Sequence, residues 1–161
     1  MNLCLDIDNV SSRSVPNPQT FDKWVRAALA ARPEASRDGA AEISLRIVDS
    51  DEIAELNHQY RGKDYATNVL SFPADLPPEL ELPHLGDIVV CAEIVEREAD
   101  EQHKPREAHW AHMIVHGTLH LLGYDHIDDA EADIMENLEI RILQSLDFAN
   151  PYLEDDVVDH V

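Results

Sequence analysis

The sequence predicts one domain of mixed α and β structure, α+β or α/β, in which helices pack around a small mixed β-sheet. Two observations lead to this fold class. Short segments with the apolar pattern of strands are intermixed along the chain with longer segments whose apolar residues recur at helical spacing. No repeat or linker divides the chain, and 161 residues suffice for one hydrophobic core. We therefore assign residues 1–152 to a single domain and 153–161 to an acidic tail that we expect to be flexible.

The first half of the chain gives strand and helix signals in turn. Strands are expected where apolar and polar residues alternate, a helix where apolar residues share one face, and loops where proline or glycine interrupts both patterns. In order, these segments are the strand 2–8, the loop 11–18, the helix 20–31, the loop 32–39 and the strand 42–48. A second helix is expected from Ser50, as its N-cap, to about Tyr60, because acidic residues occupy its first turn.

The second half is expected to complete the sheet and to add three helices. A continuous apolar run at 88–92 suits a buried central strand, and Pro73 ends a short strand before it. Pro105 suits the start of the longest of these helices, and Gly123 suits the position just after its end. The segments are a polar connection 61–67, the strand 69–72, an irregular region 74–83, the strand 88–92, and the helices 93–101, 105–122 and 128–146.

Charge and cysteine content narrow the class of protein. Lys and Arg number 12 against 33 Asp and Glu, and a net charge of −21 argues against non-specific adhesion to nucleic acid. The N-terminus lacks the pattern of a signal peptide, and no apolar stretch approaches the ~18 residues of a membrane span. We expect a cytoplasmic protein without membrane contact, in which Cys4 and Cys91 are buried, reduced thiols.

The stretch HGTLHLLGYDH, residues 116–126, predicts a metal site. His116 and His120 are four residues apart on the expected helix, so their rings share one face, and a turn at Gly123 allows His126 to approach from the following loop. Three histidine nitrogens suit Zn²⁺ best, although nickel and copper also fit, and three protein ligands leave a position for water. Histidines also occur on helices as ordinary core or surface residues. His109 and His112, on roughly the same stripe, could extend the site, but packing or hydrogen bonding is favoured for them.

The histidine spacing is that of the metzincin proteases, except that Gly117 stands where those enzymes have their catalytic glutamate. Peptide hydrolysis is therefore disfavoured, since the proton of a metal-bound water has no acceptor at this position. A reaction at phosphate depends more on positive charge. The basic candidates in this acidic chain are Arg61 and Lys63, together with Lys104 and Arg106.

Three stretches together closely resemble the YbeY family of bacterial endoribonucleases: HGTLHLLGYDH, LNHQYRGKDYATNVLSFP at 56–73 and LGDIVV at 85–90. The likeness extends from the second strand to about Tyr152. It implies an α+β fold with a zinc site on a central helix and the following loop. It also implies a single-strand-specific, metal-dependent endoribonuclease that acts on ribosomal RNA precursors, at the 3′ end of 16S rRNA, and in ribosome quality control. The ribosome or its proteins are the implied partners.

By this resemblance His116, His120 and His126 would bind one Zn²⁺ per chain, and Arg61 would be the catalytic arginine. Many members of the family have an aspartate where this chain has Asn68. The nucleophile is either water or the ribose 2′-hydroxyl. Asp125, directly before a ligand, is a candidate to orient a histidine. Two other functions remain open: a metalloprotease-like hydrolase, and a ribosome-assembly factor that acts by binding alone.

Overall fold

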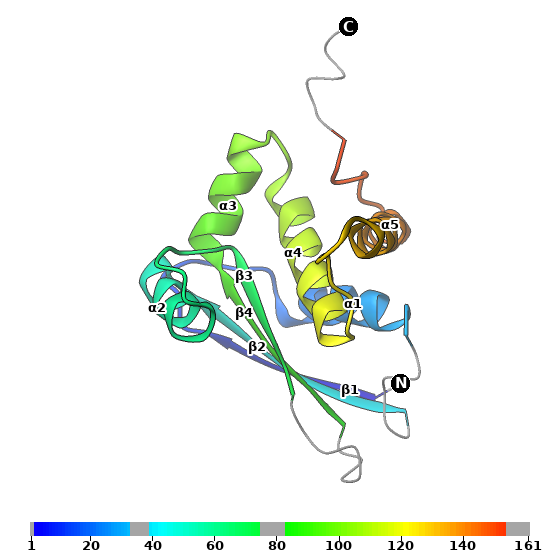
Figure 1. Ribbon diagram of the computed structural model, residues 1–161, viewed down its shortest axis with the longest axis horizontal. Helices are drawn as coiled ribbons and strands as arrows, with labels where there is room; N and C mark the ends of the chain where they lie inside the picture. The colour runs from blue at the N-terminus through cyan, green and yellow to red at the C-terminus, as the bar shows by residue number, and fades with distance from the viewer. Residues whose placement is uncertain (1, 33–38, 75–82, 154–161) are drawn as a thin grey trace, which may run out of the picture.

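The computed structural model describes residues 2–32, 39–74 and 83–153, and in these ranges it is an α+β domain, as the resemblance implied (Figure 1). The strands form one four-stranded sheet. In chain order the elements are β1 (Asn2–Asn9), α1 (Pro18–Leu29), β2 (Ala40–Val48), α2 (Ser50–Arg61), β3 (Val69–Pro73), β4 (His84–Cys91), α3 (Ala92–Glu101), α4 (Arg106–Leu121) and α5 (Asp129–Ser145).

The sheet is mixed, with strand order β1-β2-β4-β3. β1, β2 and β4 are parallel, and β3 pairs with β4 in the antiparallel direction. Helix α1 makes the crossover that the parallel pair β1 and β2 requires. The register aligns Leu45 with Ile88 and Ile88 with Ser71, so these three positions lie in one row across the sheet. This row lies beneath the helix that carries the predicted metal site.

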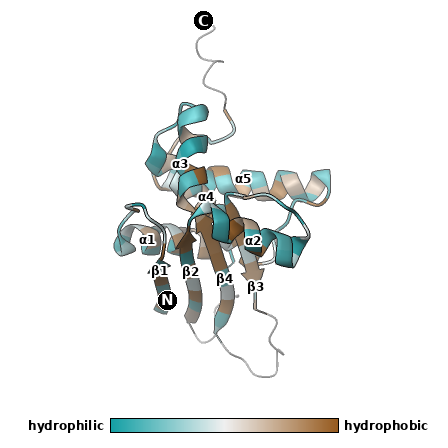
Figure 2. Cartoon of the chain, turned by 90° about the vertical axis from the view of Figure 1, so that its left-hand side faces the viewer, coloured by the Kyte–Doolittle hydropathy of each residue, from teal (hydrophilic) through white to brown (hydrophobic). Residues whose placement is uncertain are grey.

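Helices cover both faces of the sheet, but unequally. On one face α1, α4 and α5 enclose the main core, which includes Leu45, Ile88, Trp110 and Ile114. On the other face α2 covers a smaller cluster around Ile53. Figure 2 shows α2 in front of the sheet, with α4 and α5 behind it and mostly hydrophobic residues along β2 and β4. Helix α4 is therefore the buried central helix of the domain.

Most expected elements are present, with differences at their ends. β4 begins at His84, before the apolar run from Ile88, because backbone pairing with β2 and β3 extends the strand through polar residues. The N-cap of α2 is Asp49, so the prediction of Ser50 was wrong. The Asp49 carboxylate accepts hydrogen bonds from the backbone N–H and hydroxyl of Ser12, at 3.1 and 3.2 Å, instead of capping the helix.

The cysteine prediction was right for one residue and wrong for the other. Cys91 is buried, but Cys4 is exposed. Cys4 alternates along β1 with Leu3 and Leu5, which pack on the main core, so its side chain points to the opposite face of the sheet. The predicted tail 153–161 lies outside the described residues from 154 onward, as do 33–38 and 75–82 of the predicted loop regions. None of the described helices is long and apolar enough to cross a membrane.

Candidate metal centre

Helix α4 positions the predicted histidine ligands. Its buried surface packs against α1, α3, α5, β3 and β4, which fixes the helix on the sheet. His116 and His120 lie one turn apart near its C-terminal end and are half-buried. Gly123 follows with φ 99°, and the backbone N–H of Tyr124 donates to the carbonyl of Leu119, so the chain turns back as expected from the glycine.

The structure brings the three predicted ligands together. One nitrogen each from His116, His120 and His126 lies within 4.8 Å of the other two. The Nε2 atoms of His116 and His120 are 3.1 Å apart, and the exposed ring of His126 faces both from the loop after Gly123. A small pocket of about 240 Å³, lined by His116 and His126, lies between these residues and the first half of α5. Asp, Glu, His and Cys side chains form no other such group within the described part of the chain.

This arrangement fits a Zn²⁺ ion. Nitrogen ligands around one tetrahedral zinc lie about 3.3 Å from one another, which is close to the separation of the two Nε2 atoms. All three donors are imidazoles, the ligand type that zinc shares with nickel and copper. Burial is the main cause that lowers the pKa of His120 to about 4, and the neighbouring His116 adds to it, so His120 is neutral and able to bind metal near pH 7. Three ligands and an adjacent pocket leave access for water or substrate.

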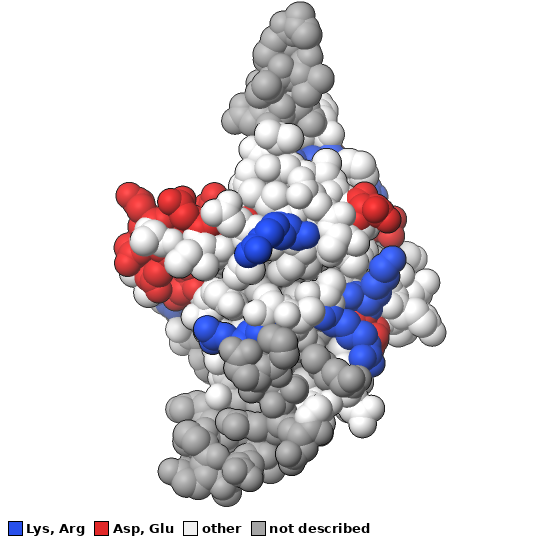
Figure 3. All heavy atoms as spheres, turned by 90° about the vertical axis from the view of Figure 1, so that its right-hand side faces the viewer, with Lys and Arg blue, Asp and Glu red and all other residues white. Residues whose placement is uncertain are grey.

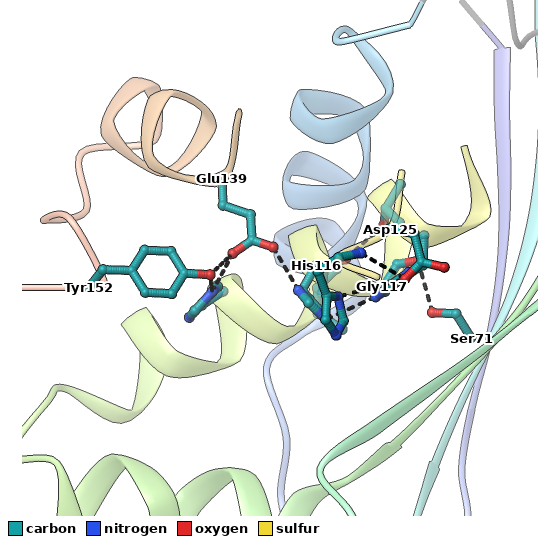
Figure 4. A network of polar contacts seen from close by, with 11 residues as sticks. Ser71, His116, Gly117, Asp125, Glu139 and Tyr152 are labelled. Atoms are coloured by element: carbon teal, nitrogen blue, oxygen red, sulfur yellow. Dashed lines mark hydrogen bonds and ion pairs between the residues drawn. The ribbon is translucent and has the colours of Figure 1, made fainter. Parts of the chain in front are cut away.

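Glu139, which was not among the residues singled out from the sequence, is hydrogen-bonded to the site from α5 (Figure 4). Its Oε2 lies 2.6 Å from Nδ1 of His116, and its Oε1 lies 2.8 Å from Nε2 of His112 and accepts a hydrogen bond from the hydroxyl of Tyr152. Burial alone would raise the pKa of Glu139, but the hydrogen bonds from His112 and His116 outweigh it and lower the pKa to about 2. Glu139 is therefore a buried carboxylate.

His109 and His112 continue the histidine stripe away from the three ligands. His109 bonds Glu98 through Nε2 at 2.9 Å, and Asn68 donates its amide N–H to the same carboxylate oxygen at 3.1 Å. Burial would raise the pKa of Glu98, but these two partners outweigh it and lower the pKa. The prediction of packing or hydrogen bonding for His109 and His112 is confirmed. Asn68 therefore stabilises this part of the fold, because its amide donates to the Glu98 carboxylate, whereas an aspartate at the same position would repel that carboxylate.

Gly117 faces the sheet rather than the histidines. Its carbonyl accepts a hydrogen bond from the Ser71 hydroxyl at 2.9 Å. A Cβ added at Gly117 would lie 3.1 Å from a methyl carbon of Ile88 and 3.3 Å from the Ser71 oxygen. A glutamate side chain at this position would therefore point into the packed interface between α4 and β3 and β4. The structure gives the missing glutamate a packing reason in addition to the chemical one.

Arg61, Asp64 and Asp87 form no hydrogen bond or ion pair with the three histidines, whereas Asp125 contacts His126 through its backbone. Arg61 is the exposed last residue of α2, on the other side of the sheet, and forms no hydrogen bond or ion pair with a described residue. Asp64 pairs with His58, and the exposed Asp87 lies 3.7 Å from His84. Asp125 is 4.0 Å from Nδ1 of His120 and 3.8 Å from Nδ1 of His126, beyond hydrogen-bond distance, and accepts instead from a backbone N–H.

The surroundings of the site are acidic. Acidic residues follow His126 in and just before the first turns of α5: Asp128, Asp129, Glu131, Asp133 and Glu136. Figure 3 shows the largest group of acidic side chains at the left edge of the face shown, and smaller acidic groups among scattered Lys and Arg elsewhere. Arg32 lies over the Tyr124 ring beside the turn at Gly123, and a cation held by the histidines would add to the local attraction for phosphate.

Comparisons with known proteins agree with the resemblance. The sequence profile of the family described as "Endoribonuclease YbeY" matches residues 6–147. A protein of Cellvibrio japonicus named "Endoribonuclease YbeY" is 56% identical over 151 residues, which cover 93% of this chain and 83% of that protein. Among solved structures, the solution structure of TM1509 from Thermotoga maritima matches with a TM-score of 0.58 and 24% identity, covering 94% of this chain and 99% of that one. The last comparison shows the fold alone.

Proposed function

This chain belongs to the endoribonuclease YbeY family, and we propose that it is a metal-dependent endoribonuclease specific for single-stranded RNA. The observation that carries the metal dependence is the convergence of His116, His120 and His126, with one nitrogen of each within 4.8 Å of the others. Together these residues would hold one Zn²⁺ per chain, within a catalytic domain spanning residues 1–152. Bound zinc supplies Lewis acidity toward a phosphoryl oxygen or a water.

The residues of the chain itself have separable tasks in this mechanism. His116 and His120 fix the cation position because α4 is held rigidly against the sheet, and His126 completes the ligand set from the loop. Arg61 would bind phosphate charge on the same RNA strand, since a guanidinium fork matches phosphate oxygens and its side chain is exposed; because it lies on the other side of the sheet from the histidines, it would act without contact to the metal ligands. RNA bound at the site would have to reach both Arg61 and the histidines, which a single-stranded segment does more readily than a stiff duplex.

Peptide hydrolysis is the less favoured alternative. It needs a general base beside the first histidine, and the position that supplies it in metzincin proteases is Gly117, packed on Ile88 and Ser71. A second candidate, a ribosome-assembly factor that acts by binding alone, is favoured by one observation. A chain with a net charge of −21 repels RNA on average and would gain from a basic protein partner.

A paired cleavage assay tests the proposal. Purified protein is incubated with single-stranded RNA and, separately, with casein, each with and without a chelator. We expect RNA cleavage that is lost on chelation and in His120→Ala, and reduced about 100-fold in Arg61→Ala. Arg141→Ala removes another exposed arginine, from α5, and serves as the matched control, with unchanged cleavage expected. RNA cleavage that survives both chelation and His120→Ala would refute the metal mechanism, and casein cleavage would favour the protease.

For the biological substrate, we propose precursors of ribosomal RNA in the cytoplasm, with maturation of the 3′ end of 16S rRNA and ribosome quality control as the processes served and ribosomal proteins as partners. Cells depleted of the protein should then accumulate 16S rRNA with extended 3′ ends. Mapping of those ends should show rescue by the unaltered chain and none by His120→Ala. Rescue by the His120 variant would instead favour the assembly factor that acts without cleavage.

A further inference from the structure

We propose that Glu139 is a positioning residue of the metal centre, which holds the ring of His116 so that its Nε2 faces the position shared with His120 and His126. The inference rests on the metal centre proposed above and adds a residue from a different helix, 23 positions further along the chain. It is carried by the geometry around one buried carboxylate, whose side chain is 1% exposed.

The contact to His116 determines which ring nitrogen is available to a metal. An ionised carboxylate only accepts hydrogen bonds, so at 2.6 Å from Oε2 of Glu139 the Nδ1 atom of His116 carries the proton. In the neutral ring the lone pair is then on Nε2, on the other side of the ring, which lies 3.1 Å from Nε2 of His120. Glu139 therefore selects the tautomer and the ring orientation that metal binding requires.

Glu139 is itself held in place on both sides. Its other oxygen, Oε1, accepts a hydrogen bond from the Tyr152 hydroxyl and lies 2.8 Å from Nε2 of His112. Along α5 the buried residues Met135, Glu139, Ile142 and Leu143 recur at helical spacing, so the apolar stripe that docks α5 also aims the carboxylate at α4. A carboxylate with three partners and almost no exposure has little freedom to rotate, which is what a positioning residue needs.

Neighbouring acidic groups do not provide the same contact. Asp125, the candidate from the sequence, is 4.0 Å from Nδ1 of His120 and accepts a hydrogen bond from the backbone N–H of His126, not from a histidine ring. Glu136 lies one turn before Glu139 on α5 and lines the same small pocket, but it is exposed and forms no hydrogen bond to the described histidines. Glu136 thus offers the same charge at nearly the same place without the contact, and it makes a matched control.

Metal affinity is the direct test. The full chain is stripped of metal, and the dissociation constant for Zn²⁺ is measured by competition with a chromophoric chelator for the unaltered chain, Glu139→Gln, Glu139→Ala and Glu136→Gln. We expect binding about 100-fold weaker in Glu139→Ala and about 10-fold weaker in Glu139→Gln, whose amide oxygen still accepts from His116. Glu136→Gln should bind within about twofold of the unaltered chain, since it keeps every contact of His116.

Two further measurements separate positioning from a merely structural effect. In the metal-free, unaltered chain, ¹⁵N chemical shifts should show His116 protonated at Nδ1, and Co²⁺ substitution should give a visible spectrum that changes in Glu139→Gln but not in Glu136→Gln. Equal affinity in Glu139→Gln and the unaltered chain would overturn the proposal, and this variant decides if Glu139→Ala does not fold. An equal loss of affinity in Glu136→Gln would also overturn it, because charge alone would then explain the effect.

Failure here is distinguishable from failure of the proposed function. Tight Zn²⁺ binding that depends on Glu139, without any RNA cleavage, would support the positioning contact and refute the nuclease. Metal-dependent RNA cleavage together with unchanged Zn²⁺ affinity in folded Glu139→Ala would support the nuclease and refute the positioning contact.

Discussion

Replacing Gly117 with alanine is expected to destabilise the protein, although alanine is the better helix former. A Cβ at this position would lie 3.1 Å from Cγ2 of Ile88, 3.3 Å from the Ser71 oxygen and 3.4 Å from a methyl carbon of Val69. Ile88 is fully buried in a central strand and is β-branched, so its methyl group cannot rotate away. The sheet must therefore move to accept even one carbon atom.

Two opposing terms set the magnitude. Helix propensity favours alanine over glycine by about 1 kcal/mol, whereas overpacking of a dense core costs about 1–3 kcal/mol. With three contacts at or below 3.4 Å on the sheet side we expect the second term to dominate, for a net loss of about 1 kcal/mol. A glutamate at position 117 would add an unpaired buried charge, and we expect a loss above about 4 kcal/mol.

Urea unfolding followed by circular dichroism measures the change. The matched control is the double variant with Ile88→Leu, which removes the Cγ2 methyl group and should recover about 1 kcal/mol of the loss in a double-mutant cycle. If Gly117→Ala were instead about 1 kcal/mol more stable than the unaltered chain, the helix would have room on the sheet side. The packing explanation for the missing glutamate would then be wrong.

Two further perturbations follow from the same packing and the same polar network. Gly86→Ala should cost more than about 3 kcal/mol in urea unfolding, because Gly86 has φ 146° and an added Cβ would lie 2.4 Å from the Phe72 carbonyl oxygen; a loss below about 1 kcal/mol would contradict this. Asn68→Asp should lower stability at pH 7 by about 2 kcal/mol, since a donor to the Glu98 carboxylate becomes a second carboxylate. Repulsion between the two carboxylates raises their pKa in the folded variant above the unfolded value. The loss of stability is therefore full at pH values above the raised pKa, and it shrinks as the pH falls toward about 4.5 because one carboxylate becomes protonated. In the unaltered chain the contribution of Glu98 to stability has the opposite sign. Its lowered pKa stabilises the fold at pH values above the unfolded pKa, and this stabilisation is lost as the pH falls through the folded pKa. Unfolding curves at pH 7 and pH 5 compare the two chains, and a deficit that grows toward pH 5 would contradict the pairing of Asn68 with Glu98.

Local sequence patterns predicted the features that depend on neighbouring residues alone, namely the helix that carries the histidines and most of the strands. His116 and His120 share a face because a helix places residues four apart together, and Gly123 ends that helix with the positive φ that glycine tolerates. The strands followed from alternation or apolar runs in the same way. The start of β4 did not, because His84 and Asp87 are polar and belong to the strand only through pairing with β2 and β3.

Contacts between distant segments were beyond such patterns. Glu139 is one of 33 acidic residues in the sequence, and its place on the apolar stripe with Met135 and Ile142 indicates burial but not the residue that it contacts. Its role depends on how α5 packs against α4, which brings it to His116 across 23 residues. The donation from Asn68 to Glu98 spans 30 residues and likewise depends on tertiary structure, because α3 continues from β4 and β4 pairs with β3. Asp125 was the natural choice from the sequence because it adjoins a ligand, but its carboxylate bonds to the backbone of the loop.

The most direct test of the central claim is a zinc titration of the metal-free protein, with RNA cleavage measured at each point. If His116, His120 and His126 form the catalytic metal centre, cleavage should rise from none to a plateau at one Zn²⁺ per chain. His120→Ala should neither bind Zn²⁺ tightly nor cleave RNA at that plateau concentration. Full cleavage in the metal-free protein, or a plateau that His120→Ala leaves unchanged, would contradict the account.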